Sequence, residues 1–322
     1  MRVADGVART VLTDLWGEAA GLLADPLMQR ALLAALLVGL AAPVIGTYLV
    51  QRHLSLLGDG IGHVALTGVA VGWFVGSIVG AVPADAFAVP GAIVAAVVGA
   101  VAIELVRERG RTSGDVALAL LFYGGIAGGV LIISQAGGTS ANLMGYLFGS
   151  ISTVTSTDLT LTVVLTVLVL VVGVGLRTAL FAVSHDEEFA RSAGLPVRVL
   201  NLAIAVIAAL TVTVAMRVVG LLLVSALMIV PVAVAQLVTT SFRRTMTTAM
   251  AIGAVVCVTG LTITYWHDVS PGATIVVLAI GLYAVTATLR PLLLARARRS
   301  RGFVDPHPQV DDDVELTRHG AP

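Results

Sequence analysis

Apolar residues dominate this chain in long blocks, each close to the length that a helix needs to cross a membrane. At a rise of about 1.5 Å per residue, about 20 residues cross a hydrocarbon core of about 30 Å. The roughly ten-residue alternating segments of a transmembrane β-barrel are absent from the sequence. The pattern therefore predicts an all-α membrane protein with about nine transmembrane helices, at 31–50, 56–79, 87–106, 115–135, 157–176, 199–216, 219–238, 246–266 and 273–290.

The composition agrees with a membrane protein and excludes one source of energy. Of the 322 residues, 57% are hydrophobic and 12% are charged, whereas a soluble domain carries about 25% charged residues. All 19 basic residues are Arg, and the sequence contains no lysine. A Walker A loop needs its Lys to bind phosphates, so the chain is not a conventional P-loop ATPase. Energy from ATP would have to come through a partner. The single Cys257 cannot form an intrachain disulfide.

Charge and breaker residues divide the chain into three regions. Residues 1–29 mix acids with apolar residues, which predicts an amphipathic helix on the membrane surface rather than a cleaved signal peptide. Residues 30–292 form the transmembrane domain. Residues 293–322 begin with a cluster of Arg and continue with acids and prolines, which predicts a basic membrane anchor followed by a disordered tail.

Arginine is concentrated in alternate loops, which predicts the orientation of the chain. The loops 80–86, 136–156 and 267–272 contain no Arg, whereas the loops between them do. The positive-inside rule therefore predicts an external N-terminus and a cytoplasmic C-terminus. The external segment 136–156 is too polar to span, but its middle is apolar for about nine residues. It is either a re-entrant or surface-lying helix, or a loop that covers the bundle.

The stretch Gly58-Asp59-Gly60-Ile61-Gly62-His63 places an acid and an imidazole four residues apart at the start of an apolar run. In a helix, both side chains project from the same face. A carboxylate and an imidazole are plausible ligands for zinc or manganese, and ionisable residues inside a membrane segment are commonly functional. The alternatives are a buried ion pair or an acid stabilised at a helix start. The predicted topology places the pair about 6–12 Å from the cytoplasmic end of its helix, unless 58–62 is unwound.

The cytoplasmic segment 184–199 predicts a short helix between two spans, at about 185–197. Its acids Asp186, Glu187 and Glu188 lie in the first turn, where the helix dipole favours them, and Gly194 and Pro196 end it. A short capped helix of this kind is a candidate docking element for a partner's groove, although a solvated connector has the same composition.

Two further features are weaker candidates. Pro231 lies inside an apolar span and predicts a helix kink. His267 and Asp268 precede a turn on the predicted external side, where they are either an entry-side metal site or a polar turn.

Three stretches of the sequence together resemble the membrane permeases of bacterial ATP-binding-cassette importers for zinc and manganese. They are 49–70, which contains the Asp59 and His63 stretch, 186–201, which begins DEEFARSAGLP, and 219–231, which reads VGLLLVSALMIVP. The stretches occur in the order expected for that family, and the similarity covers about residues 30–292.

This resemblance implies properties that the residue patterns alone do not show. It implies a type II, vitamin-B12-importer-like permease bundle that forms a homodimer in the bacterial cytoplasmic membrane. It also implies cytoplasmic ATPase subunits and an extracytoplasmic metal-binding protein. Asp59 and His63 match positions thought to bind the metal in transit, and 186–196, with Ala190, matches the coupling helix.

The expected function is thus the permease subunit of an ATP-driven importer of zinc or manganese. In this interpretation, the chain has no catalytic residues or permanent cofactor, a partner hydrolyses ATP, and nucleic acid is not a partner. The alternative is a secondary transporter driven by protons or sodium, in which Asp59 and His63 form a proton relay. An intramembrane hydrolase is a poorer fit, because no second ligand cluster is predicted at the same depth.

Overall fold

The computed structural model describes residues 24–109, 114–136, 140–149, 155–267 and 269–300. Most of the predicted N-terminal segment, most of the tail and Asp268 lie outside these ranges. In the described part of the chain, the regular structure is entirely helical.

Nine of the described helices are long and apolar enough to cross a membrane, which confirms the predicted fold class. These helices are α2 (Pro26–Gln51), α3 (Leu57–Val79), α4 (Ala88–Arg109), α5 (Gly114–Gln135), α7 (Ser156–Gly175), α10 (Val197–Val219), α11 (Leu221–Val238), α12 (Phe242–Trp266) and α13 (Pro271–Ser300). The short elements are η1 (Ala84–Phe87), α6 (Ser140–Phe148), α8 (Arg177–His185) and α9 (Glu187–Ser192).

Capping residues explain several helix boundaries. The Asp25 side chain accepts a hydrogen bond from the backbone N–H of Leu27 at 2.9 Å, and Pro26 occupies the first helical position. Helix α2 therefore begins at Pro26, before the predicted boundary at residue 30. Thr155 and Asp158 form a reciprocal capping box at the start of α7.

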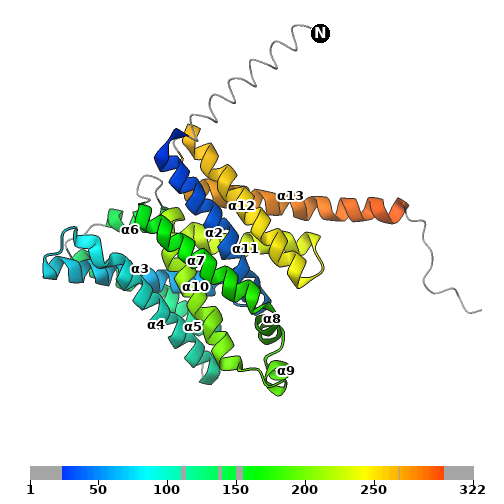
Figure 1. The fold of residues 1–322 in the computed structure, drawn as a ribbon, viewed down its shortest axis with the longest axis horizontal. Coiled ribbons are helices and arrows are strands. Elements are labelled where there is room, and N and C mark those ends of the chain that lie inside the picture. The colour runs from blue at the N-terminus through cyan, green and yellow to red at the C-terminus, as the bar shows by residue number, and fades with distance from the viewer. Residues whose placement is uncertain (1–23, 110–113, 137–139, 150–154, 268, 301–322) are drawn as a thin grey trace, which may run out of the picture.

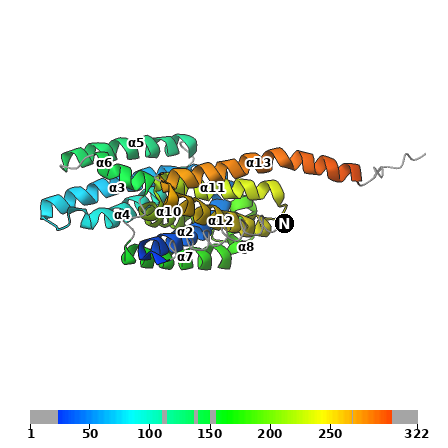
Figure 2. The same cartoon turned by 90° about the horizontal axis from the view of Figure 1, so that it is seen from above.

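Helices α2 and α10 form the centre of the bundle, because their spans are the most buried of the nine. Helices α5 and α13 are the least buried, and Figure 2 shows them along the same side of the molecule, with α7 on the opposite side. Figure 1 shows α9 at the lower edge of the bundle and α13 projecting beyond its body. The bundle therefore has a central core and one side where two helices are largely uncovered.

Small residues let the central helices approach closely. A Cβ atom added to Gly46 of α2 would overlap the backbone carbonyl oxygen of Met228 in α11. Without a hydrophobic driving force between helices in lipid, contacts of this kind between small residues and a neighbouring backbone stabilise helix pairs. Pro231 is buried inside α11, which is assigned as one helix from Leu221 to Val238. The kink predicted there stays a prediction.

The described part of the predicted external segment is α6, which packs on the turn between α10 and α11. A Cβ atom added to Gly149, directly after α6, would lie 2.5 Å from the carbonyl carbon of Val219. Gly220 in the turn has a φ of 86° and lies against the same backbone. The segment thus contains a short helix, as the first alternative predicted, and this helix packs on the bundle.

We expect Gly46→Ala to destabilise the protein, because the added methyl group would meet backbone atoms that cannot rotate away. Overpacking of this kind costs about 1–3 kcal/mol. The measurement is the thermal unfolding midpoint of the purified protein in detergent. Gly175→Ala is the matched control, because a Cβ atom there has no neighbouring atom within 4 Å. Equal midpoints for the two variants would contradict the packing argument.

Candidate functional site

Asp59 and His63 occupy the first two turns of α3, on one face of the helix. Asp59 Oδ1 lies 3.7 Å from His63 Nε2. The His63 residue is 6% exposed, and its Nδ1 atom has no hydrogen-bond partner among the residues that the structure describes. The Asp59 side chain is 24% exposed. The stretch 58–62 is helical and not unwound.

Two neighbouring helices, α5 and α11, contact the start of α3 at the pair. The ring of Phe122 in α5 contacts the His63 ring edge to face, with centroids 4.4 Å apart. Glycines bring the start of α3 close to its neighbours: a Cβ atom at Gly58 would lie 3.1 Å from Met228 Sδ of α11. On this side, Ser225 Oγ of α11 donates a hydrogen bond to Asp59 Oδ1 at 3.2 Å.

The start of α3 packs against the middle of α10. Cβ atoms added to Gly58 and Gly62 would lie 3.9 Å and 3.1 Å from the side chain of Val212 in α10. Val212 lies eleven residues, about 16 Å, after Asn201 near one end of α10, and seven residues, about 10 Å, before Val219 at the other end. Leu57 at the start of α3 is buried, whereas Leu56 directly before it is 63% exposed. The predicted distance of about 6–12 Å from the cytoplasmic end of this helix stays a prediction.

The geometry of the pair suits a weak metal site better than a tight one. In the described residues, no group of three or more His, Cys, Asp or Glu side chains could hold a metal ion. The separation of 3.7 Å is too long for a direct hydrogen bond between Asp59 and His63. A carboxylate oxygen and an imidazole nitrogen are both available as ligands, and the positive end of the α3 dipole stabilises the carboxylate. One chain thus offers two ligands of the predicted kinds.

The predicted docking segment forms α9, which is shorter than the expected 185–197. Asp186 caps it, since its side chain accepts a hydrogen bond from the N–H of Phe189 at 2.9 Å. Gly194 has a φ of 80°, and the N–H of Leu195 bonds to the carbonyl oxygen of Ala190, which is a standard helix stop. Ala190 is buried, whereas Phe189 is 64% exposed. Glu188 and Pro196 are also exposed, so α9 presents a polar surface with one projecting ring.

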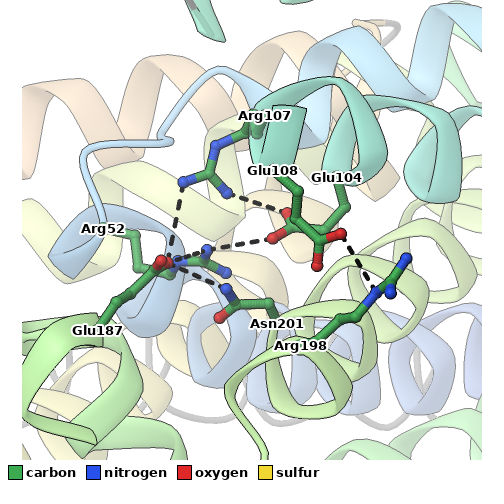
Figure 3. Close-up of polar contacts among 7 residues, drawn as sticks. All are labelled: Arg52, Glu104, Arg107, Glu108, Glu187, Arg198 and Asn201. Carbon is green, nitrogen blue, oxygen red and sulfur yellow. Dashed lines mark hydrogen bonds and ion pairs between the residues drawn. The ribbon is translucent and has the colours of Figure 1, made fainter. Parts of the chain in front are cut away.

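Glu187 connects α9 to the rest of the bundle, a contact that the sequence did not predict. Its carboxylate lies 2.9 Å from Arg52 and accepts a hydrogen bond from Asn201 at 3.0 Å (Figure 3). Arg52 also lies 3.6 Å from Glu104, and Arg107 lies 2.9 Å from Glu104. We call these five residues the charge cluster. A cavity of about 690 Å³ borders it.

Arg52, Glu104 and Asn201 are the buried members of the charge cluster, whereas the Glu187 side chain is 40% exposed. The Arg52 side chain is only 4% exposed. Burial lowers the pKa of the Arg52 guanidinium, and the carboxylates of Glu104 and Glu187 oppose this shift. The predicted topology placed Arg52, Glu104 and Glu187 on the same side of the membrane, and this was the one indication in the sequence that they could meet. The sequence does not show which of them pair, because the paired residues are up to 135 positions apart.

The remaining candidates lie elsewhere. His267 is exposed directly after α12, at the connection to α13, and its predicted partner Asp268 is outside the described residues. Arg217, at the end of α10, pairs with the capping residue Asp158 at 3.1 Å. The structure brings Asp59 and His63 together, and separately joins Glu187 to Arg52.

Comparison with known proteins identifies a family for nearly the whole bundle. The model of the ABC 3 transport family matches residues 24–290. A manganese transport system membrane protein, MntC of Halalkalibacterium halodurans, is 31% identical over 281 residues, which cover 87% of this chain and 93% of that protein. A chelated iron transport system membrane protein, YfeD of Yersinia pestis, is 30% identical over 262 residues, which cover 81% of this chain and 85% of that protein.

A solved structure has the same architecture. It is PsaBC from Streptococcus pneumoniae in complex with Fab, with a TM-score of 0.73 and 29% sequence identity. The match covers 84% of this chain and 95% of that chain. The similarity therefore extends to both the fold and the sequence, over the region that contains Asp59, His63 and α9.

We expect Arg52→Ala to destabilise the protein strongly, because the change leaves Glu104 buried without one of its two positive partners. Removing one partner of a buried ion pair costs about 3–5 kcal/mol. The control is Arg198→Ala, which removes a surface pair with Glu108 in which Arg198 is 71% exposed; such pairs contribute about 0–1 kcal/mol. Thermal unfolding in detergent compares the variants, and a larger loss for Arg198→Ala would refute the ranking.

Proposed function

The chain belongs to the ABC 3 transport family, and from this membership we propose that it is the membrane-spanning permease subunit of an ATP-driven importer of divalent manganese or zinc. The observation that carries the proposal is the Asp59 and His63 pair at the start of α3, where the helix packs against α10 and α11. The named functions of the manganese and iron relatives support a divalent metal as substrate.

The proposed role of Asp59 and His63 follows from the cost of moving an ion through a bilayer. A charge in hydrocarbon costs several kcal/mol or more, so the path must replace the ligands that water provides. The replacement ligands must also release the ion, which requires weak or divided binding. A carboxylate and one imidazole from each chain meet both demands, since neither chain alone completes a site.

A homodimer with the path at its centre would complete the site. Asp59 is 24% exposed in the single chain, and a carboxylate that faces lipid is costly. Helices α5 and α13, the least buried spans, lie along one side of the molecule (Figure 2). Helix α5 packs against α3 and α13 packs against α11. A second copy docked over this side would cover Asp59 and bring the two pairs together.

Helix α9 would dock on two cytoplasmic ATPase subunits, one helix from each chain of the dimer, and would couple ATP hydrolysis to movement of the permease. Its exposed Phe189 suits a groove on a partner, and Glu187 joins it to Arg52 in the connection between α2 and α3. A displacement of α9 would thus reach the start of α3 and expose the metal to either side in turn. An extracytoplasmic metal-binding protein would deliver the ion, and the C-terminus would lie in the cytoplasm.

The alternative is a secondary transporter in which the pair relays protons. It does not account for the capped α9 with its exposed ring, because a carrier that works alone needs no docking helix. Uptake that follows a proton gradient without any ATPase would favour it.

We expect His63→Ala and Asp59→Asn each to reduce metal uptake by more than about tenfold, because each removes one ligand per chain. The measurement is ATP-dependent uptake of manganese and zinc by proteoliposomes that contain the chain and its ATPase. His53→Asn is the control, because His53 is an exposed histidine with a φ of 57° that Asn tolerates. Uptake by His63→Ala at the control level would reject the ligand role.

We expect Phe189→Ala and Gly194→Leu to lose the ATPase during purification. The first change removes the projecting ring, and the second forces a branched side chain into a left-handed backbone conformation. Val199→Ala is the control, since it truncates an exposed apolar residue of the same region outside α9. Co-purification yields measured against tagged permease test this, and unchanged yields for both variants would contradict docking through α9.

A further inference from the structure

Ser225 places a third potential metal donor beside the Asp59 and His63 pair. It is 8% exposed and lies in α11, where Gln236 is the only other polar side chain. Its hydroxyl oxygen is 3.2 Å from Asp59 Oδ1, and that same carboxylate oxygen is 3.7 Å from His63 Nε2. A buried hydroxyl, a carboxylate and an imidazole therefore meet at one point between α3 and α11.

These separations are close to those of neighbouring ligands on a single metal ion. Two donors bound at about 2.1 Å lie about 3.0 Å apart in octahedral geometry and about 3.4 Å apart in tetrahedral geometry. The Ser225 oxygen already lies within this range of Asp59, and His63 needs to move only slightly. The free Nδ1 atom of His63 shows that the imidazole is not committed to another protein group in the described chain.

We infer that Ser225 is a third metal ligand of each chain and that it sets the preference for manganese over zinc. The inference rests on the proposed function and names the residue that chooses among its substrates. Two chains would then offer two imidazole nitrogens and four or more oxygens, a six-coordinate, oxygen-rich set. Such a set suits manganese, whereas zinc favours four ligands with more nitrogen or sulfur.

The position of Ser225 on a different helix also explains release. Asp59 and His63 share α3, so their separation stays nearly constant when that helix moves as a body. Ser225 belongs to α11 and separates from Asp59 when α3 tilts away. Each chain then loses one oxygen ligand, and the remaining four-ligand set holds manganese less tightly.

The first test is a competition experiment on the complete complex of permease and ATPase in proteoliposomes. Uptake of manganese is measured against increasing zinc for the unmodified protein, Ser225→Ala and Thr213→Val. The control removes another buried hydroxyl, whose hydrogen bond goes to Ala209 within its own helix. We expect Ser225→Ala to shift the preference toward zinc by about tenfold and the control to leave it unchanged.

The outcomes separate this inference from the proposed function. If the unmodified complex takes up neither metal, the proposed function fails and the inference fails with it. If it takes up manganese and Ser225→Ala keeps the same preference, only the inference is overturned. If Ser225→Ala lowers the uptake of manganese and zinc equally, without a shift in preference, the inference is also overturned. Such a result would mean that Ser225 has only a structural role.

A second measurement does not depend on transport. Ser225→Cys would replace the hydroxyl with a thiol, and cadmium added to the purified complex would give the ultraviolet absorption of a thiolate bound to metal. The natural Cys257 is wholly buried in α12, so the unmodified complex supplies the baseline. No new absorption in Ser225→Cys would overturn the inference. His63→Ala in the same background should weaken the signal.

Discussion

The structure depends on one constraint: a carboxylate must sit inside a membrane bundle without facing lipid. Asp59 meets it through three contacts, which are the dipole at the start of α3, the hydroxyl of Ser225 and the nearby His63 ring. The Ser225 contact exists only because α3 approaches α11 closely. A Cβ atom at Gly58 would lie 3.1 Å from Met228 Sδ of α11, so a larger residue there would displace the Met228 side chain.

The charge cluster differs in role from the Asp59 and His63 pair. A buried ion network is weak evidence of stability, because desolvation offsets most of the attraction between its charges. What the network provides is a fixed geometry. Arg52 follows the last residue of α2 and contacts Glu187 of α9, while only residues 52–56 separate α2 from α3. A displacement of α9 would therefore act on Arg52 through the ion pair with Glu187. The short connection 52–56 would pass that displacement on to α3, the helix that carries Asp59.

The sequence was sufficient for features that depend on local pattern. Length and apolarity predicted the nine spans, and the spacing of four residues predicted that Asp59 and His63 share a face. Contacts between distant segments were not predictable. Ser225 meets Asp59 across 166 positions, and Arg52 meets Glu187 across 135. The depth of the pair in the membrane stays a prediction.

An incomplete site in each chain is a requirement of transport rather than a defect. A site that held a divalent ion within one rigid helix would keep the same affinity whichever side it faced. In the proposed mechanism, the ligand groups are divided among elements that can move apart: Asp59 and His63 on α3, Ser225 on α11, and the same groups of a second chain. Affinity can then change with the relative position of helices, and that change is what the work of ATP would have to drive.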